Sequence, residues 1–344
     1  MSARSQAAAN PVQRERLLSA LACAGAAWFT PGPAWAQMAD PLVEAREARW
    51  WLGRMHEAAS RKSFHGTFVV SAGGSVTSSR IVHFSQGNNQ YERIESLDGQ
   101  RRQVYRHNDA VLTLWPANRL ALLESRTAIN RFPALLQSSA DHIVRLYDVQ
   151  PLGVDRVAGL DANVLLLKPR DGFRFGLRLW AEKNSGLLLR AEVLGERDEI
   201  IESSAFSDVQ IGIRPQPELV LQAMRRLDGF RVERPIIEPA NLAQEGWLTR
   251  GLPPGFDLTS SVRRVIDVDQ PRPGVLQSNF ADGLTHVSVF IEPFNPQRHK
   301  RELLMSMGAT QTLAKRRGDW WFTVIGDVPV LTLRTFAAAL ERQK

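Results

Sequence analysis

The chain has 344 residues, a formal net charge of +7 and a single cysteine, Cys23. One cysteine excludes an intramolecular disulfide and a cysteine metal site, and a chain of this size buries enough surface to fold without cross-links. Beyond residue 36 no segment approaches about 20 consecutive apolar residues, so the sequence predicts no membrane-spanning helix there.

The first 36 residues have the composition of a secretory signal peptide. Two arginines precede a short apolar run, residues 17–29, and Ala34-Trp35-Ala36 offers a small-x-small cleavage site before Gln37. A lipoprotein processing site at Cys23 is the alternative, and the shortness of the apolar run before it disfavours this reading. We therefore predict export to a bacterial periplasm.

The net charge of residues 37–344 indicates which classes of binding partner are favoured. Removal of residues 1–36 takes away three arginines and one glutamate, so the net charge falls from +7 to +5. Export disfavours nucleic acid as a partner. Anionic lipid headgroups or an acidic protein segment suit a mildly basic protein, and a merely solvated basic surface is the alternative.

A helix is predicted first, over residues 41–62. Asp40-Pro41 provides an N-cap followed by proline at the first helical position. Trp51, Leu52 and Met55 then fall on one face, as in a helix that covers an apolar surface.

A series of short strands with frequent turn signals follows. The alternation predicts strands at 64–70, 81–85, 91–97, 102–106, 111–115, 120–123, 142–149, 163–168 and 199–211, with a second helical piece at 133–140. About ten strands with two helices indicate a large antiparallel sheet, and a sheet of that size curls. We therefore predict an open half-barrel covered by helices.

The clearest alternation lies between Phe173 and Val193. Phe173, Phe175, Leu177 and Leu179 alternate with polar residues, and after a Gly-bearing loop Leu187, Leu189 and Ala191 resume the same phase. This pattern predicts a β-hairpin with one apolar and one solvated face. The apolar face either packs as an ordinary core or leaves room for an apolar ligand.

The composition and the periodicity of the sequence change near residue 213. Residues 214–246 are rich in proline and predict a linker region with a short helix at 219–227. Residues 247–344 then predict a small α+β domain. It contains a hairpin with an Asp-Gly turn at 282–283, a short helix at 301–307, strands at 310–314 and 320–325, and a closing helix at 331–340. The predicted domains are residues 37–213 and 247–344.

Motifs for catalysis are missing from the sequence. It has no G-x-S-x-G, no P-loop and no dinucleotide-binding glycine pattern. The seven histidines do not show a usual metal-ligand spacing, so no catalytic residue, cofactor or metal ligand is predicted. The adjacent tryptophans Trp50-Trp51 and Trp320-Trp321 are each expected to place one ring in the core and the other near the surface.

Three stretches resemble the RseB/MucB family of periplasmic regulators of the envelope-stress sigma factor. They are "SLDGQRRQVYR" at residues 96–106, "FADGLTHVSVFIEP" at 280–293 and "WFTVIGDVPVLTLRTFAAAL" at 321–340. The resemblance implies a first domain similar to the lipoprotein carriers LolA and LolB, with a hollow suited to acyl chains. It also implies binding to the periplasmic part of a membrane-anchored anti-sigma factor, which is thereby shielded from proteolysis, and release by lipopolysaccharide or another lipid.

Two sets of candidate binding residues follow. The lipid set is Trp51, Met55, Phe68, Val70, Phe84, Leu112, Leu114, Phe175, Leu177, Leu179 and Leu189. The partner-protein set is Phe290, Trp320, Trp321 and Arg264. Ordinary core packing is the alternative for every member of the lipid set.

Two other classes of function remain open alongside the regulator. A periplasmic lipid or lipoprotein carrier would use the same hollow, but it needs no second domain. An envelope hydrolase would need a serine, a histidine and a carboxylate brought together, and no serine stands in a recognisable nucleophile context. A homo-oligomer is left open.

Overall fold

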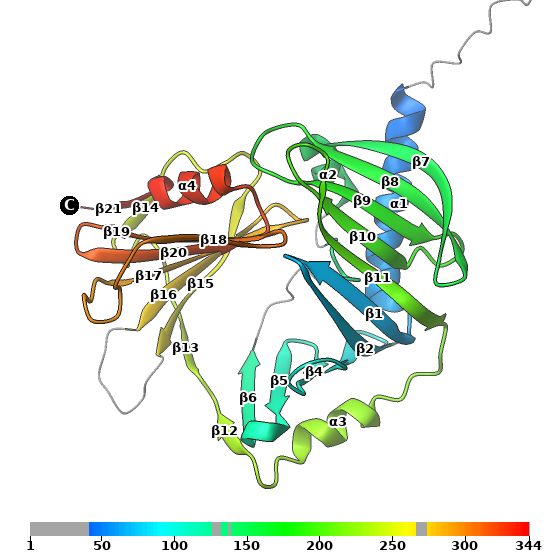
Figure 1. The fold of residues 1–344 in the computed structure, drawn as a ribbon, viewed down its shortest axis with the longest axis horizontal. Helices are drawn as coiled ribbons and strands as arrows, with labels where there is room; N and C mark the ends of the chain where they lie inside the picture. The colour runs from blue at the N-terminus through cyan, green and yellow to red at the C-terminus, as the bar shows by residue number, and fades with distance from the viewer. Residues whose placement is uncertain (1–40, 126–131, 137–138, 266–273, 344) are drawn as a thin grey trace, which may run out of the picture. The chain divides into compact units, whose positions relative to one another are not determined.

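The structure is a computed structural model that describes residues 41–125, 132–136, 139–265 and 274–343 (Figure 1). The predicted signal peptide lies outside these residues. The described residues belong to one compact unit that begins after Ala39. Within them, no helix is both long enough and apolar enough to cross a membrane.

The largest element is an open 12-stranded sheet with the strand order β12-β6-β5-β4-β3-β2-β1-β11-β10-β9-β8-β7. All its pairings are antiparallel except that of β12 with β6. Its strands are β1 Phe64–Ala72, β2 Ser75–Gln86, β3 Asn89–Ser96, β4 Gln103–His107, β5 Ala110–Trp115, β6 Leu120–Ser125, β7 Tyr147–Val157, β8 Leu160–Pro169, β9 Gly176–Glu182, β10 Leu188–Leu194, β11 Ile200–Ile211 and β12 Arg231–Glu233.

A smaller, seven-stranded sheet follows with the order β13-β15-β16-β17-β20-β19-β18, and β14 pairs separately with β21. The strands are β13 Ile236–Pro239, β14 Trp247–Thr249, β15 Asp257–Val265, β16 Val275–Ala281, β17 His286–Pro293, β18 Leu303–Met307, β19 Thr310–Arg317, β20 Trp320–Gly326 and β21 Leu340–Arg342. The helices are α1 Pro41–Arg61, η1 Pro116–Asn118, α2 Ala140–Leu146, α3 Glu218–Arg225 and α4 Val330–Ala339.

Helix α1 packs on one face of the large sheet because its apolar residues recur at helical spacing. Ala48, Leu52, Met55 and Ala58 are each at most 3% exposed, whereas Trp50 is 54% exposed. Trp51 beside it is buried, as predicted for that pair.

Strand β1 packs closely against β11 at Gly66. A Cβ atom at this position would lie 2.3 Å from the carbonyl oxygen of Asp208 in β11, so the close approach requires glycine.

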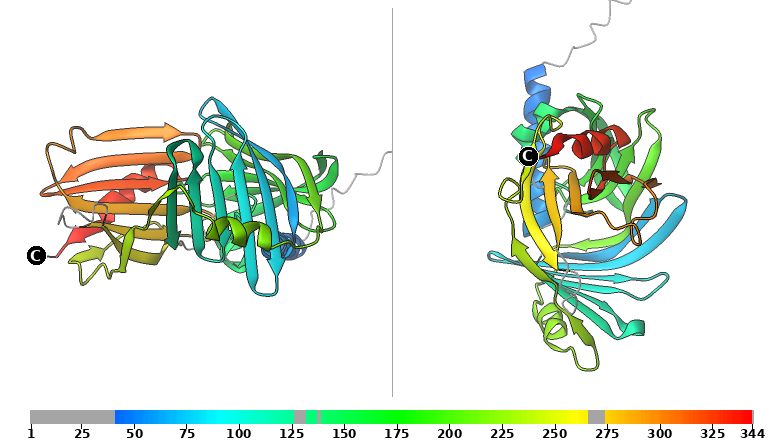
Figure 2. Two further views of the ribbon diagram at one scale, coloured as in Figure 1. Left: turned by 90° about the horizontal axis from the view of Figure 1, so that it is seen from below. Right: turned by 90° about the vertical axis from the view of Figure 1, so that its left-hand side faces the viewer.

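Helix α3 covers the opposite face of the large sheet, over β2 to β5 (Figure 2). Phe64, in the cluster with α1, pairs across the sheet with His83, so Phe84 must point to the other face. There it packs with Leu112 and with Val220 of α3. The predicted linker region thus provides the cover for one face of the large sheet.

The small sheet carries its own core beneath α4. Phe280, Val289, Phe322 and Phe336 belong to one cluster of buried side chains. Trp247 lies edge-on to Trp320, with ring centroids 5.3 Å apart. The Asp-Gly hairpin, strands 310–314 and 320–325, and the closing helix are confirmed within the bounds given above.

Three predictions about secondary structure are wrong. The helical piece predicted at 133–140 is not helical at residues 133–136, and helix α2 begins only at Ala140. Residues 142–146, predicted to be a strand, belong to α2, and β7 begins only at Tyr147. Residues 303–307, predicted to be helical, form β18 because they pair with β19 across a two-residue turn. The linker region, whose separation from the two domains stays a prediction, contributes β12 to the large sheet and β13 to the small sheet. Its prolines therefore do not prevent strand pairing at the sheet edges.

Candidate functional site

The α1-covered face of the large sheet is the first candidate site. Trp51, Leu52 and Met55 of α1 meet Leu179 and Ala191 of the central hairpin in one buried cluster. This cluster continues into a second one, in which Phe68 faces Phe206 at a ring-centroid distance of 6.2 Å. The described residues therefore place a continuous layer of apolar side chains between helix and sheet.

A segment from between β6 and α2 adds to this layer. The ring of Phe132 lies 5.7 Å from that of Phe68 and 5.2 Å from that of Phe206. His56 of α1 hydrogen-bonds through Nδ1 to the carbonyl oxygen of Leu136 at 2.8 Å. Residues 132–136 thus tie the helix to the apolar layer.

The polar side of the Phe173–Val193 hairpin is not a solvated face. Glu192 is fully buried and receives hydrogen bonds from Arg178, at 3.1 Å, and from Arg190. The Arg190 guanidinium lies 4.6 Å from the centroid of the Trp180 ring, and the Trp180 indole donates to Asp155. The alternation is real, but the second face is a buried polar cluster, because charged groups that are paired can be buried.

The second candidate site is the junction between the two sheets, centred on Arg174. Its guanidinium donates to Asp282 at 2.6 Å, to Asp171 at 2.5 Å and to the carbonyl oxygen of Pro254. The guanidinium carbon also lies 4.8 Å from the Phe256 ring centroid. The side chains of Arg174 and Asp282 are both 0% exposed, so this Arg174 network is a fully buried ion pair between the large sheet and the small sheet.

Asp282 serves the small sheet as well as the junction. Its second carboxylate oxygen accepts the backbone N–H groups of Leu284 and Thr285 in the loop between β16 and β17. The loop places Leu284 in the same cluster as Trp51 and Tyr147. The turn of the strongest predicted hairpin is therefore the point at which the small sheet enters the core of the large one.

Further contacts join the two sheets. Thr332 of α4 donates to the carbonyl oxygen of Phe173 at 2.7 Å. Arg264 of β15 donates to Glu124 of β6 at 2.7 Å. The N–H of Ala309, in the turn between β18 and β19, donates to the Glu202 carboxylate of β11 at 3.2 Å. Contacts between the two sheets thus involve both polar side chains and backbone.

Glu202 gives the junction a pH dependence. Burial raises the pKa of Glu202 above its ordinary value near 4.5. The hydrogen bond from the Ala309 N–H opposes this shift in the pKa, and the Asp327 carboxylate adds to it. The folded state therefore holds this proton to higher pH than the unfolded state, and the free energy of unfolding falls as pH rises from about 4.5 through the folded pKa.

Replacing Glu202 with glutamine is expected to raise the melting temperature at pH 7 to 8, because glutamine mimics the protonated carboxyl and still accepts the Ala309 N–H. The difference from the unaltered protein should vanish below about pH 4, where both forms are neutral. Thermal unfolding followed from pH 3.5 to 8 measures this. A lower melting temperature of the variant at pH 7 contradicts the assignment.

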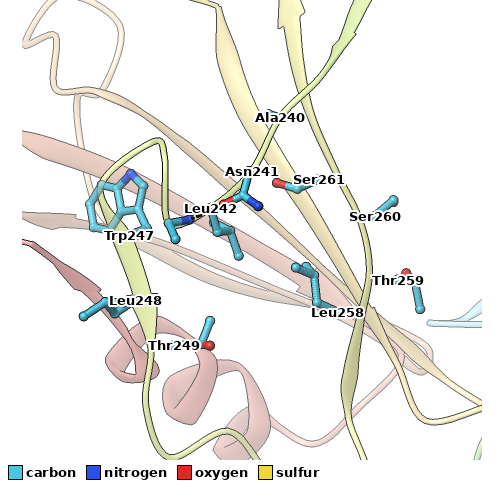
Figure 3. A pocket seen from close by; sticks show the side chains of 11 residues that line it. Ala240, Asn241, Leu242, Trp247, Leu248, Thr249, Leu258, Thr259, Ser260 and Ser261 are labelled. Carbon is cyan, nitrogen blue, oxygen red and sulfur yellow. Dashed lines mark hydrogen bonds between the residues drawn. The ribbon is translucent and has the colours of Figure 1, made fainter.

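Two surface pockets lie away from the α1-covered face. One of about 360 Å³ runs beside β15 where β13 has ended, between Leu258 and the turn that carries Asn241 (Figure 3). The other, of about 430 Å³, adjoins the Arg174 network and is lined by Phe175, Lys168 and Leu331. In the described part of the chain, no group of three or more His, Cys, Asp or Glu side chains is placed to hold a metal.

Comparison with known proteins bears on both candidate sites. A model of the MucB/RseB N-terminal domain matches residues 47–224, and a model of the MucB/RseB C-terminal domain matches residues 241–341. The chain belongs to the MucB/RseB family. Its relatives include the sigma factor AlgU regulatory protein MucB of Pseudomonas aeruginosa, 31% identical over 88% of this chain and 94% of that protein. The sigma-E factor regulatory protein RseB of Haemophilus influenzae is 23% identical over 85% and 90%, respectively.

Solved structures of family members have the same fold. A crystal structure of MucB in complex with MucA(peri) superimposes with a TM-score of 0.64 and 27% identity, covering 86% of this chain and 99% of that one. A second structure, of the MucA/MucB complex of Pseudomonas aeruginosa, gives a TM-score of 0.66 and 28% identity over 87% and 99%.

The lipid set predicted from the sequence is divided by the structure of this MucB/RseB chain. Trp51, Met55, Leu177 and Leu179 share one cluster, and Phe68, Val70 and Leu189 share the adjoining one. Phe84, Leu112 and Leu114 lie on the opposite face, beneath α3. Phe175 lines the pocket beside the Arg174 network. Strand alternation assigns residues to faces only within a strand, which is why the sequence could not separate these groups.

The partner set is likewise distributed. Phe290 is half-buried on the face of the small sheet away from α4, because its neighbours Val289 and Ile291 point into the core. Trp320 packs against Trp247, and Trp321 is buried with its ring stacked 4.7 Å from that of His299. Arg264 is paired with Glu124.

Sequence reasoning missed the Arg174 network. Arg174 occupies a polar position of an alternating pattern, which suggests a solvated face, and its partner is 108 residues away. The one available signal was the Asp-Gly turn, which marks Asp282 as a turn residue without indicating what its carboxylate binds.

Proposed function

We propose that this chain is a periplasmic negative regulator of the envelope-stress sigma factor. It binds the periplasmic part of a membrane-anchored anti-sigma factor and shields it from proteolysis, and its large sheet senses lipid. The observation that carries the proposal is the correspondence, over 86% and 87% of this chain, with a structure of MucB in complex with MucA(peri) and with a structure of the MucA/MucB complex. The mild positive charge of residues 37–344 supports an acidic partner.

The two predicted domains, residues 37–213 and 247–344 with a linker region between them, are part of this proposal. The matches of two separate family models, to residues 47–224 and 241–341, support the division. The Arg174 network joins the two predicted domains, so we propose that it couples lipid binding to partner binding. A lipid that binds one arrangement of the two domains more tightly raises the population of that arrangement, and this changes the affinity for the partner.

The lipid site is proposed on the α1-covered face of a LolA-like half-barrel. Side chains of α1, β9 and β10 pack on this face in one buried cluster around Trp51. In this proposal an acyl chain enters when α1 or the Phe132 segment moves outward. Movement of α1 would disturb Leu284, which links the same cluster to the small sheet.

The binding of an anti-sigma factor is testable directly. Purified protein of residues 37–344 is expected to bind the periplasmic domain of Pseudomonas aeruginosa MucA in a calorimetric titration and to slow its digestion by an added protease. Vesicles that contain lipopolysaccharide should weaken both effects, whereas neutral phosphatidylcholine vesicles should not. No binding and no protection would refute the regulatory proposal.

A periplasmic lipid or lipoprotein carrier is the alternative, favoured by the apolar layer beneath α1. A carrier should bind a fluorescent acyl chain and pass it to acceptor vesicles without retaining the MucA domain. The regulator should retain the MucA domain whether or not it transfers lipid, so the two functions give different results in the same pair of assays. We propose no enzymatic activity, because no nucleophile context is recognisable in the sequence.

A further inference from the structure

Strand β18 is an edge strand whose side chains are all exposed. Among the residues that the structure describes it pairs only with β19, and its sequence Leu-Leu-Met-Ser-Met contains four large apolar residues. Their exposed fractions are 39% for Leu303, 47% for Leu304, 58% for Met305 and 66% for Met307. Protective devices such as an internal proline or lysine are missing from this strand, so it can pair with a further strand.

The geometry of the hairpin shows which backbone groups are free to pair. Met307 and Thr310 flank a two-residue turn whose first member, Gly308, has φ of +59°. In such a hairpin the flanking residues exchange hydrogen bonds, and bonded and non-bonded pairs then alternate along the strand. Residues 303, 305 and 307 therefore bond to β19. The N–H and C=O groups of Leu304 and Ser306 point away from the sheet.

Charge defines the kind of strand that suits this edge. Lys300 and Arg301 lie three and two residues before Leu303, the first residue of β18, with Glu302 between them and the strand. Lys315 follows Ala314, the partner of Leu303. Of the nearby carboxylates, Glu292 is paired with Arg298, and Glu302 accepts the backbone N–H of Arg316 but keeps its charge. Lys300, Arg301, Glu302 and Lys315 together therefore carry a net charge of +2. Within the described residues these three cations have no ion pair. The other end of the strand lies near Glu202, so basic charge is concentrated at the Leu303 end.

We propose that β18 is a docking site for an extended peptide segment of a partner protein, with alternating apolar residues and an acidic C-terminal end. The segment would add to the small sheet as an antiparallel strand, which continues the antiparallel order of that sheet and places its C-terminal end beside Lys300 and Arg301. Main-chain hydrogen bonds to Leu304 and Ser306 would hold it, and Met305 and Met307 would contact its apolar side chains.

A peptide fits this edge better than a second copy of the chain. The Met307–Gly308 end lies against the turn between β1 and β2, where a Cβ on Gly73 would be 3.3 Å from the backbone nitrogen of Gly308. An added strand needs only about 4.8 Å beside β18, whereas a second copy must also clear this turn. The proposal goes beyond the proposed function, since it requires neither an anti-sigma factor nor a lipid.

Fluorescence anisotropy with synthetic peptides tests this site on the protein of residues 37–344. The probe is a fluorescein-labelled peptide of alternating threonine and valine that ends in three aspartates. A matched peptide ends in three lysines. The acidic peptide is expected to bind about tenfold more tightly at low salt, and the combined charge reversal Lys300→Glu and Arg301→Glu should remove this preference. Equal binding of both peptides would overturn the proposal.

The backbone is tested separately. Leu304→Pro removes an outward N–H that β19 does not use, so the hairpin should persist while affinity falls about tenfold or more. Leu304→Ala keeps the N–H and serves as the matched control. A peptide N-methylated at alternate residues tests the same bonds without altering the protein, and undiminished binding of it would overturn the proposal.

Two further measurements distinguish a bound peptide from a second copy of the chain at the β18 edge. Hydrogen exchange should show that the acidic peptide protects the amides of Leu304 and Ser306, and unchanged exchange there contradicts strand addition. Sedimentation velocity should show the same association state for the unaltered protein and for Leu304→Pro. Concentration-dependent dimers that Leu304→Pro abolishes would overturn the proposal in favour of pairing between two copies.

Discussion

Replacing Arg174 with methionine is expected to lower the free energy of unfolding by about 3–5 kcal/mol, and the melting temperature by roughly 6–20 °C. Methionine fills much of the same volume but leaves the Asp282 carboxylate buried without its cation. It also removes the donor to the Pro254 carbonyl oxygen. Calorimetry of the protein of residues 37–344 measures the loss.

Matched variants separate the buried pair from a general loss of charge. Arg178→Met removes an arginine that is 33% exposed and whose partner Glu192 keeps Arg190, so its effect should be well under half as large. Adding Asp282→Asn to Arg174→Met should restore part of the stability, because a neutral amide still accepts the N–H groups of Leu284 and Thr285.

The same variant tests whether Arg174 couples the two sheets. With the network intact the two sheets should unfold in one transition, and in Arg174→Met the small sheet should show faster hydrogen exchange than the large one. If Arg174→Met unfolds at the same temperature as the unaltered protein, the buried pair does not stabilise the junction.

Replacing Trp51 with alanine is expected to cost about 3–5 kcal/mol, because the ring is buried between α1 and the large sheet. Trp50→Ala is a closely matched control. It removes the same side chain one position earlier, where 54% of it is exposed, and should cost less than about 1 kcal/mol. Denaturant unfolding of both variants measures the difference, and equal losses would contradict the assigned orientation of α1.

Trp51→Ala also bears on the lipid proposal. Loss of the ring should loosen α1, which hydrogen exchange in residues 46–61 would show, and a fluorescent acyl chain should bind more readily because the covering helix opens at lower cost. Looser α1 with weaker acyl binding would indicate that the Trp51 ring contacts the lipid itself.

Local pattern alone predicted the elements whose partners are close in sequence. The hairpins around residues 185 and 283, strand 320–325, and helices α1, α3 and α4 follow from period and turn chemistry, and the structure has them within a few residues. Strand β15 was missed, and β18 was taken for a helix. A five-residue apolar run carries no period of its own, and pairing with β19 decides its conformation.

The candidate sites were harder to predict than the fold. Trp51, Met55 and Leu179 of the predicted lipid set share one buried cluster, and their binding of lipid stays a prediction. Nothing local places Phe84 beneath α3 and Phe68 beneath α1. That division depends on strand register across the sheet and on which helix packs against which face. Both are set by contacts between segments far apart in the chain.

The sequence by itself determined the family, the strand-rich class and the amphipathic helices, because these depend on short-range period, turn residues and recognisable stretches. Tertiary structure alone decided that Arg174 is buried against Asp282 and that a turn of the small sheet enters the core of the large one. The physical reason is that a charged residue is predicted to be solvent-exposed unless its partner is known. Here the partner of Arg174 lies far away in the sequence, next to a strand of the other sheet.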